Sequence, residues 1–411
     1  MKLVKLGDLC NFFNGGAWTQ NEFSNTGCPV LKVSNCKNSG FEIADISYIP
    51  HEIAQRSEHN KLFVGDVIIA TVGSHPNLIE SAAGRSCIVT KKVEGFYLNQ
   101  NAVCLRSKDT CILDQRYLGY LATSQPFTHY IQSRGKGAAN QMRIAIGAIK
   151  DYQFMLPNVD IQCRIGSILG DFDDLIENNQ KQIKLLEEAA QRLYKEWFVD
   201  LRFPGHENTP IVDGVPEGWK TGRADSFFNI SIGKTPPRAE KQWFTENGKG
   251  IPWISISDMG SSSTFVFYTS EELTTDAISK HNVRVVPADT VLVSFKLTVG
   301  RVSIATANTC TNEAIAHFLL PDTSMREYTY LYLKCFEYDS LGNTSSISKA
   351  VNSKIIKAMD FIMPDQTTIE QFHEVVKPIL DAIRDKQEMN HKLAEARDRL
   401  LPKLMNGEIE V

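Results

Sequence analysis

Two long segments of this chain show the apolar spacing of amphipathic helices. We expect the first helix to run from about Asp160 to Val199 and the second to cover most of residues 363–408. In both segments apolar residues alternate in steps of four and three, which predicts a coiled-coil seam over several heptads. The seam positions are Ile161, Ile165, Ile168, Phe172, Leu175, Leu186, Ala189, Leu193 and Trp197, and then Phe372, Val375, Ile379, Ile383, Leu393, Leu400 and Leu404.

The middle of each segment is polar. Polar groups on a seam cost stability but fix register and orientation, so these positions predict one defined pairing of the two helices. The alternative is two separate surface helices, each packed on its own domain. Pro378 is expected either to kink the second helix or to mark the first turn of its long straight part. The polar positions are Asn178, Asn179, Gln180 and Gln182 in one segment and Lys386, Gln387 and Asn390 in the other.

The two helical segments also repeat each other. Pro157 matches Pro364, Gln180 matches Gln387, and Leu193 matches Leu400, always 207 positions apart and without a gap. Such spacing predicts a tandem duplication with pseudo-twofold symmetry. A symmetric pair of readers suits a target that also comes in two halves, of which duplex DNA is the commonest.

A block of mixed pattern precedes each helix, at residues 1–155 and 218–362. Short strand-like runs separated by Gly, Asn and Ser predict mixed α/β domains, and the clearest runs are Val64–Val72, Ser86–Val89, Val291–Phe295 and Val302–Ala305. The blocks echo each other, for instance in LNQNAVCL (98–105) and CTNEAIAHF (310–318). We therefore predict an α+β chain with two such domains, helical segments at 156–203 and 363–411, and a Pro- and Gly-rich linker at 204–217.

Composition narrows the class of protein. The formal net charge is −4, but the two blocks are relatively basic while the helical segments and linker are acidic, and phosphate contact needs only a local basic face. The nine cysteines include no CxxC pair, which favours reduced thiols in a cytoplasm. No apolar run approaches the roughly 20 residues of a membrane span, and the start MKLVKLGDLCNFF lacks the features of a signal peptide.

Motifs of the common enzymes are missing. The GKT at 233–235 would need a glycine at position 228 to form a phosphate-binding loop, and that residue is Phe228. No GxGxxG, HExxH, GxSxG or metal-spaced Cys/His cluster is present. The sequence therefore predicts a chain without catalytic activity, bound cofactor or metal, and makes a methyltransferase acting alone improbable.

Four segments resemble the specificity subunit of Type I restriction–modification enzymes. These are LYKEWFVDLRFPG (193–205), VPEGWK (215–220), RLLPKLMNGEI (399–409) and GKTPPR (233–238). The first block has Gly15-Gly16-Ala17-Trp18 in place of GKTPPR, which puts its local loop geometry in doubt. The resemblance spans the chain and implies that each block is a target recognition domain for half of a bipartite DNA sequence, with the helices as an antiparallel spacer.

The resemblance also implies partners. Two modification subunits would bind S-adenosylmethionine and methylate adenine in double-stranded DNA, and two restriction subunits, if present, would use ATP and magnesium to translocate and cleave it. Adenine methylation requires the base to leave the stack, so that chemistry would belong to the partner. Exposed helix faces including Trp197 and Phe198 would dock the partner, with core packing as the rival explanation for both aromatics.

Base reading needs side chains with two hydrogen-bonding groups on loops that reach the major groove. In the first block we expect these from Ser74, His75, Asn77, Arg134, Lys136, Asn140, Gln141 and Arg143. In the second block we expect them from Lys234, Arg238, Lys296, Arg301, Asn343, Ser345, Ser346, Lys349, Asn352 and Lys354. The alternative for each residue is a solvated loop, and for the whole chain a coiled-coil adaptor that pairs two domains binding ligands other than nucleic acid.

Overall fold

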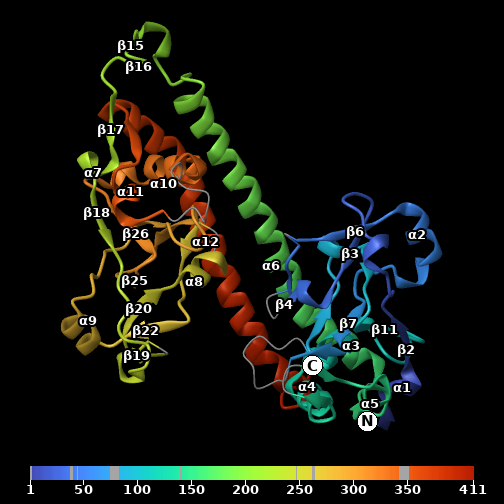
Figure 1. The fold of residues 1–411 in the computed structure, drawn as a ribbon. Helices are drawn as coiled ribbons and strands as arrows, with labels where there is room; N and C mark the ends of the chain where they lie inside the picture. Colours follow the sequence, from blue (N-terminus) through green and yellow to red (C-terminus); the bar gives the residue numbers. More distant parts are fainter. Residues whose placement is uncertain are drawn as a thin grey trace. The chain divides into compact units, whose positions relative to one another are not determined.

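The chain folds into two compact units (Figure 1). The computed structural model describes residues 2–37, 40–43, 45–74, 83–138, 141–246, 248–261, 264–341 and 351–411. The first unit contains residues 1–175 and 393–411, and the second contains residues 176–392. Each unit is thus one mixed block together with parts of both long helices, α6 (Val159–Tyr194) and α12 (Gln366–Met405).

The first unit is built on a central antiparallel sheet with strand order β2-β11-β7-β9. Smaller sheets are ordered β10-β3-β6 and β12-β13-β8, and β1 pairs with β14. The strands are β1 (Lys2–Lys5), β2 (Cys10–Asn14), β3 (Cys28–Leu31), β4 (Cys36–Lys37), β5 (Gly40–Phe41), β6 (Ser47–Ile49), β7 (Val67–Ala70), β8 (Val72–Gly73), β9 (Ser86–Ile88), β10 (Tyr97–Leu98), β11 (Ala102–Ser107), β12 (Lys136–Ala138), β13 (Gln141–Arg143) and β14 (Gln153–Leu156). The helices of this block are α1 (Leu6–Leu9), α2 (His51–Arg56), α3 (Gln115–Thr123), α4 (Gln125–Ser133) and α5 (Ile146–Lys150).

The second unit repeats the central sheet and the β10-β3-β6 sheet of the first unit, with one additional strand in each. Its central sheet is ordered β18-β26-β23-β24-β21, a smaller sheet is ordered β19-β22-β20-β25, and β17 pairs with β27. The strands are β15 (Ile211–Val212), β16 (Val215–Pro216), β17 (Lys220–Arg223), β18 (Asn229–Ile232), β19 (Phe244–Thr245), β20 (Ile251–Ile254), β21 (Phe265–Val266), β22 (Glu271–Leu273), β23 (Val291–Ser294), β24 (Val302–Ala305), β25 (Cys310–Thr311), β26 (Ile315–Leu319) and β27 (Asp360–Met363). The helices are α7 (Ala224–Phe227), α8 (Ile256–Ser261), α9 (Thr275–His281), α10 (Arg326–Cys335) and α11 (Ser353–Lys357).

The repeat is confirmed, and three of the four predicted strands are confirmed to within one residue, whereas the run Val64–Val72 is divided between β7 and β8. The central strands β7 and β23 are buried at every residue and apolar except at Ser294, as expected for strands covered on both faces. The spacing of 207 also holds outside the long helices, because β14 and β27 and then α5 and α11 lie 207 positions apart. The duplication therefore includes the segment that leads from each block into its helix.

The two long helices run antiparallel in each unit. In the first unit the start of α6 packs with the end of α12: Leu169 and Leu404 share one core, and Asp173 forms an ion pair with Arg397. In the second unit the end of α6 packs with the start of α12, where Phe198 lies 4.8 Å from Phe372 between ring centroids. The alternative of two helices packed separately, each on its own domain, is therefore wrong.

The polar middle of the helices forms specific contacts in the second unit. The Asn179 side-chain amide donates to the Asn390 side-chain oxygen at 2.9 Å, and Asn179 is only 3% exposed. Gln387 accepts a hydrogen bond from the backbone N–H of Phe265 at 3.1 Å, which ties α12 to β21. Buried amide pairs of this kind fix register, as the sequence pattern predicted.

Pro378 lies inside the second helix. Helix α12 begins at Gln366 and continues through position 378 to Met405. Asp365 caps its start, because the Asp365 carboxylate accepts from the backbone N–H and the hydroxyl of Thr368. Among the described residues, no helix is long and apolar enough to cross a membrane.

Candidate nucleic-acid interface

One end of the central sheet gathers several loops in the first unit. Strands β2 and β7 end there and β11 begins there, because Ala102 is the register partner of Ala70 and Val103 that of Asn14. The backbone N–H of Thr71 donates to Asn101 at 2.8 Å, and that of Ile144 donates to Thr71 at 2.8 Å. We call residues 15–17, 71–74, 99–101 and 136–143, where described, the first loop edge.

A basic hairpin lies on the first loop edge. Strands β12 and β13 pair so that Lys136 faces Arg143, and β13 pairs in turn with β8, directly before Ser74. Both cations are exposed, and neither has an ion-pair partner among the residues that the structure describes. Like charges directly opposite each other on a sheet destabilise it, so this arrangement favours binding of an anion.

The second unit has an equivalent edge. Strands β18 and β23 end and β26 begins at one end of the central sheet, with Ser294 the partner of Ile315 and Ile232 that of Ala316. The backbone N–H of Phe295 donates to Ala314 at 2.9 Å, matching the bond from Thr71 to Asn101. We call residues 233–235, 295–301 and 312–314 the second loop edge.

At each loop edge the backbone of a glycine lies close against the carbonyl oxygen of an asparagine. A Cβ atom on Gly15 would lie 1.8 Å from the Asn99 carbonyl oxygen, and one on Gly233 would lie 2.1 Å from that of Asn312. The backbone N–H groups of both glycines also make equivalent bonds, to Ala102 and Ile315. The first block therefore keeps this close glycine–asparagine approach even though it lacks the GKTPPR sequence.

Charged groups converge on the second loop edge. The Thr235 hydroxyl donates to the Glu313 carboxylate, and Lys296 and Arg238 lie close enough to act on it electrostatically. Desolvation alone would raise the pKa of Glu313, but the Thr235 hydrogen bond, a hydrogen bond with the Glu313 backbone and the two nearby cations together bring that pKa below its ordinary value. Glu313 is therefore ionised at neutral pH and sits among cations.

The β23–β24 loop presents an exposed tip on this edge. Leu297 is 98% exposed and has a φ of 61°, in the left-handed region that leucine seldom adopts. Ser294 holds the loop, since its carbonyl accepts from Gly300 N–H at 2.9 Å and its hydroxyl accepts from Arg301 N–H at 3.0 Å. Lys296 lies directly beside this tip and is also exposed.

Two of the predicted cations of the second block are already bound by other protein groups. Arg238 makes a two-bond ion pair with Glu271 and lies 4.5 Å from the ring centroids of both Phe244 and Trp253. The Arg301 guanidinium donates to the carbonyl oxygen of Ile256 at 2.7 Å. These two side chains hold loops in place, whereas Lys234 and Lys296 extend into solvent.

Several other predicted residues lie at the ends of both blocks. Arg134 is exposed and stacks on Tyr130 at 3.9 Å, and Lys354 is exposed. The Asn352 side-chain oxygen caps α11 by accepting from the N–H groups of Lys354 and Ile355. Outside the described residues lie His75, Asn77, Asn140, Asn343, Ser345, Ser346 and Lys349, and for Gln141 only the backbone is described.

Trp197 and Phe198 do not form an exposed face. Each is 8% exposed, on a π-helical turn (Lys195–Val199) that ends α6. Phe198 packs on Tyr328 and Trp219, and Trp197 packs on Phe372, in the main core of the second unit. The expectation that these aromatics dock a partner is corrected: core packing, the rival explanation, accounts for both.

Two residues of the loop edges were not predicted from the sequence. Gln100 precedes β11 by two residues, Glu313 precedes β26 by two residues, and both side chains are exposed. The echo between LNQNAVCL and CTNEAIAHF already contained both positions. Their place on the edges became visible only when the pairing of β11 and β26 with neighbouring strands was known.

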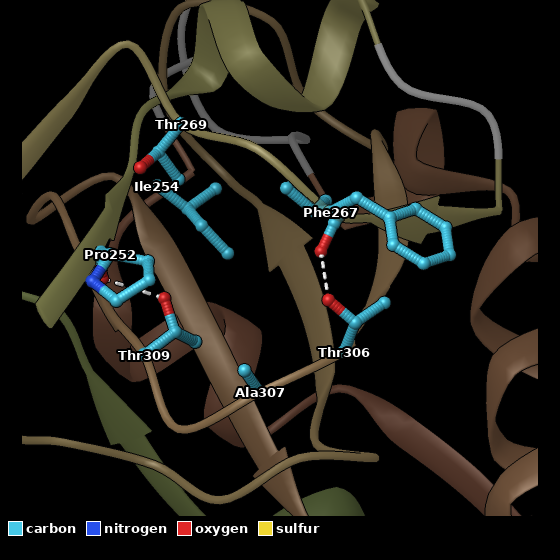
Figure 2. Close-up of a pocket in the computed structure, with 8 residues that line it drawn as sticks. Pro252, Ile254, Phe267, Thr269, Thr306, Ala307 and Thr309 are labelled. Carbon is cyan, nitrogen blue, oxygen red and sulfur yellow. Dashed lines mark hydrogen bonds between the residues drawn. The ribbon is translucent and has the colours of Figure 1, made fainter. Parts of the chain in front are cut away.

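Figure 2 shows a small pocket in the second unit, lined by Pro252, Ile254, Val266, Phe267, Thr269, Thr306, Ala307 and Thr309. The hydroxyl groups of Thr306 and Thr309 donate to the backbone carbonyls of Val266 and Pro252 at 2.7 and 2.8 Å. The lining has no charged residue. In the part of the chain that the structure describes, no cluster of His, Cys, Asp or Glu could hold a metal ion.

Two blocks that share a central sheet, each with a loop edge that carries cations, define a paired recognition protein. The family model for the Type I restriction modification DNA specificity domain matches the chain twice, over residues 1–188 and 216–393. The chain therefore belongs to the family of Type I restriction–modification specificity subunits, which recognise DNA and do not themselves catalyse a reaction.

Known proteins agree with this assignment along the whole chain. The putative type I restriction enzyme MjaX specificity subunit of Methanocaldococcus jannaschii is 23% identical over 416 residues, covering 99% of this chain and 93% of the relative. The type I restriction enzyme HindI specificity subunit of Haemophilus influenzae is 23% identical over 476 residues, covering 99% of both. The crystal structure of the S subunit of a Type I restriction–modification system from M. genitalium has a TM-score of 0.57 at 15% identity, covering 98% of this chain and 95% of that one, which supports the fold.

Proposed function

We propose that the two blocks, residues 1–155 and 218–362, are target recognition domains that each read one half of a bipartite DNA sequence. Residues 156–203 and 363–411 form the spacer, and residues 204–217 link the two halves. The observation that carries this proposal is the basic hairpin, in which Lys136 faces Arg143 without an acidic partner among the described residues. The equivalent second loop edge, with Lys234 and Lys296, supports a second reader of the same kind.

The chain would act within a larger enzyme. Its relatives are named as specificity subunits of type I restriction enzymes, so we infer that this chain assembles with modification and restriction subunits. Two modification subunits would bring S-adenosylmethionine and methylate adenine, and restriction subunits would bring ATP and magnesium. With Trp197 and Phe198 buried, the surface that recruits these partners involves other residues.

Charge reversal on the first loop edge tests DNA contact. The double variant K136E/R143E, in complex with the cognate modification subunit, is expected to bind target DNA more weakly. The slope of log affinity against log salt should also become shallower by about 2, since each lost phosphate contact removes roughly 0.9 from it. Fluorescence anisotropy at four or five salt concentrations measures both quantities.

The variant K91E/K108E is the matched control. Lys91 follows β9 and Lys108 follows β11, so both lie at the opposite end of the same sheet, and the change in net charge is identical. We expect this control to keep the wild-type salt slope. Equal slopes for all three proteins would contradict a role for the basic hairpin in DNA binding.

The spacer helices are proposed to set the gap between the half-sites. At 1.5 Å per residue, four residues inserted into both helices, after Asn179 and after Lys386, add about 6 Å to each. The methylated motif should then contain a gap longer by about one or two base pairs. Four residues inserted at the Asp213–Gly214 turn of the β15–β16 hairpin should leave the gap unchanged. An unchanged gap after lengthening both helices would refute the proposal that helix length sets the gap.

The alternative is an adaptor that pairs two domains binding ligands other than nucleic acid. It predicts no fall of DNA affinity with salt, whereas phosphate contacts require a steep one. The family match over both blocks disfavours the adaptor.

A further inference from the structure

The loop edges of the two units place one exposed side chain at the same position. Gln100 and Glu313 each lie two residues before the strand that runs through the middle of the sheet. Each follows an asparagine. The carbonyl oxygen of Asn99 lies against Gly15, and that of Asn312 lies against Gly233. The sheet register, the glycine contact and the matching backbone bonds to Ala102 and Ile315 all make the two positions equivalent.

These two residues differ in the bases that they suit. A glutamine amide donates to and accepts from adenine at N7 and N6, whereas a carboxylate only accepts and suits the amino group of cytosine. The backbone N–H of Gln100 donates to Gly16, and no hydrogen bond holds the Gln100 side chain among the described residues. The Oε2 atom of Glu313 accepts from the Thr235 hydroxyl, which orients the exposed carboxylate toward a donor.

A carboxylate on a DNA-facing edge has a cost. It repels the phosphates of every DNA sequence, and Lys296 and Arg238 offset this only in part. Only a base that presents an amino group in the major groove would compensate for that repulsion. Such a residue lowers affinity for all DNA and restores it for the correct sequence, which is how a repulsive element creates specificity.

We propose that Gln100 and Glu313 are specificity-determining residues, with Gln100 reading an adenine in one half-site and Glu313 reading a cytosine in the other. This inference rests on the proposed function, since it assigns base contacts within the recognition domains. It predicts that each position controls one base of one half-site and leaves the other half-site alone.

The test is the list of methylated motifs in cells that express the chain with its cognate modification subunit. Glu313→Gln keeps the side-chain shape, and we expect it to relax or change one base of one half-site. In binding assays it should tighten binding to non-specific DNA while lowering discrimination at that base about 5- to 150-fold. Gln100→Glu should alter one base of the other half-site. Thr235→Val removes the hydroxyl that holds Glu313, and should relax the same base as Glu313→Gln.

Glu217→Gln is the control, because it makes the same charge change in the linker and should leave both the motif and non-specific binding unchanged. Identical motifs for the wild type, Glu313→Gln and Gln100→Glu would overturn the inference while the bipartite function stood. A wild-type complex that methylated no bipartite motif would instead refute the proposed function itself. A gain of non-specific affinity in Glu313→Gln without loss of discrimination would reduce Glu313 to a general electrostatic role and contradict base reading.

Discussion

Replacing Phe198 by alanine is expected to lower the free energy of unfolding of the second unit by about 3–5 kcal/mol, the usual cost of emptying a buried phenylalanine site. Phe198 is 8% exposed, and its ring lies 4.6, 4.8 and 5.6 Å from those of Tyr328, Phe372 and Trp219. The chain has five tryptophans, of which only Trp18 lies in the first unit, so fluorescence during urea unfolding reports mainly on the second unit.

Leu185→Ala is the matched control on the same helix. Leu185 is 64% exposed, so its loss should change stability by no more than about 0.5 kcal/mol. The Phe198→Ala complex should also methylate the wild-type motif at reduced yield. If this variant unfolded like the wild type yet failed to bind the modification subunit, the result would contradict core packing and favour a docking role for Phe198.

Replacing Arg326 by methionine is the second change with a large expected effect. Arg326 donates two hydrogen bonds to Glu327, at 2.9 and 2.6 Å, and the Glu327 side chain is completely buried. Asp289 and Asp381, which also pair with Arg326, are about one-third exposed and can be solvated. Removing the guanidinium leaves the buried Glu327 carboxylate with His373 alone, whose Nδ1 lies 2.6 Å from Oε2, and should cost about 3–5 kcal/mol.

The double variant Arg326→Met/Glu327→Met separates a buried charge from lost packing. Because both buried charges are then absent, most of the stability should return. Arg223→Met breaks an ion pair with Asp225 that is largely exposed, and should cost less than about 1 kcal/mol. Urea unfolding followed by fluorescence measures all three proteins. A double variant as unstable as the single one would show that packing, not charge, sets the cost.

The sequence was sufficient to predict the elements that have long-range regularity. The heptad spacing marked both helices, and the offset of 207 marked them as a repeat, which the structure extends to β14 and β27 and to α5 and α11. Runs such as VIIA and VLV marked the central strands because strands buried on both faces are mainly apolar. These signals come from periodicity and burial, which a single sequence displays directly.

Pairings between distant segments were not visible in the sequence. Nothing in the pattern showed that β1 pairs with β14, or that Leu400, Leu401 and Leu404 of α12 complete the core of the first unit. Apolar residues at helical spacing look alike whichever partner covers them. For the same reason the sequence left Trp197 and Phe198 open between core and surface.

The candidate site was predicted in part. The segments around Ser74 and Arg134–Arg143 were selected separately, and the β8–β13 pairing brings them onto one edge. Gln100 and Glu313 were missed because a single exposed polar residue in a loop has no periodicity, and only the strand register reveals its neighbours. Arg301 and Asn352 were chosen for their chemistry, yet both hold backbone groups in place.

The most direct test of the central claim is exchange of the second block. Residues 218–362 are replaced by the corresponding block of another family member, and the methylated motifs are sequenced in cells that contain the cognate modification subunit. We predict a new sequence in one half-site, with the other half-site and the gap as in the wild type. A motif altered in both halves, or in neither, would contradict the claim that each block recognises one half-site.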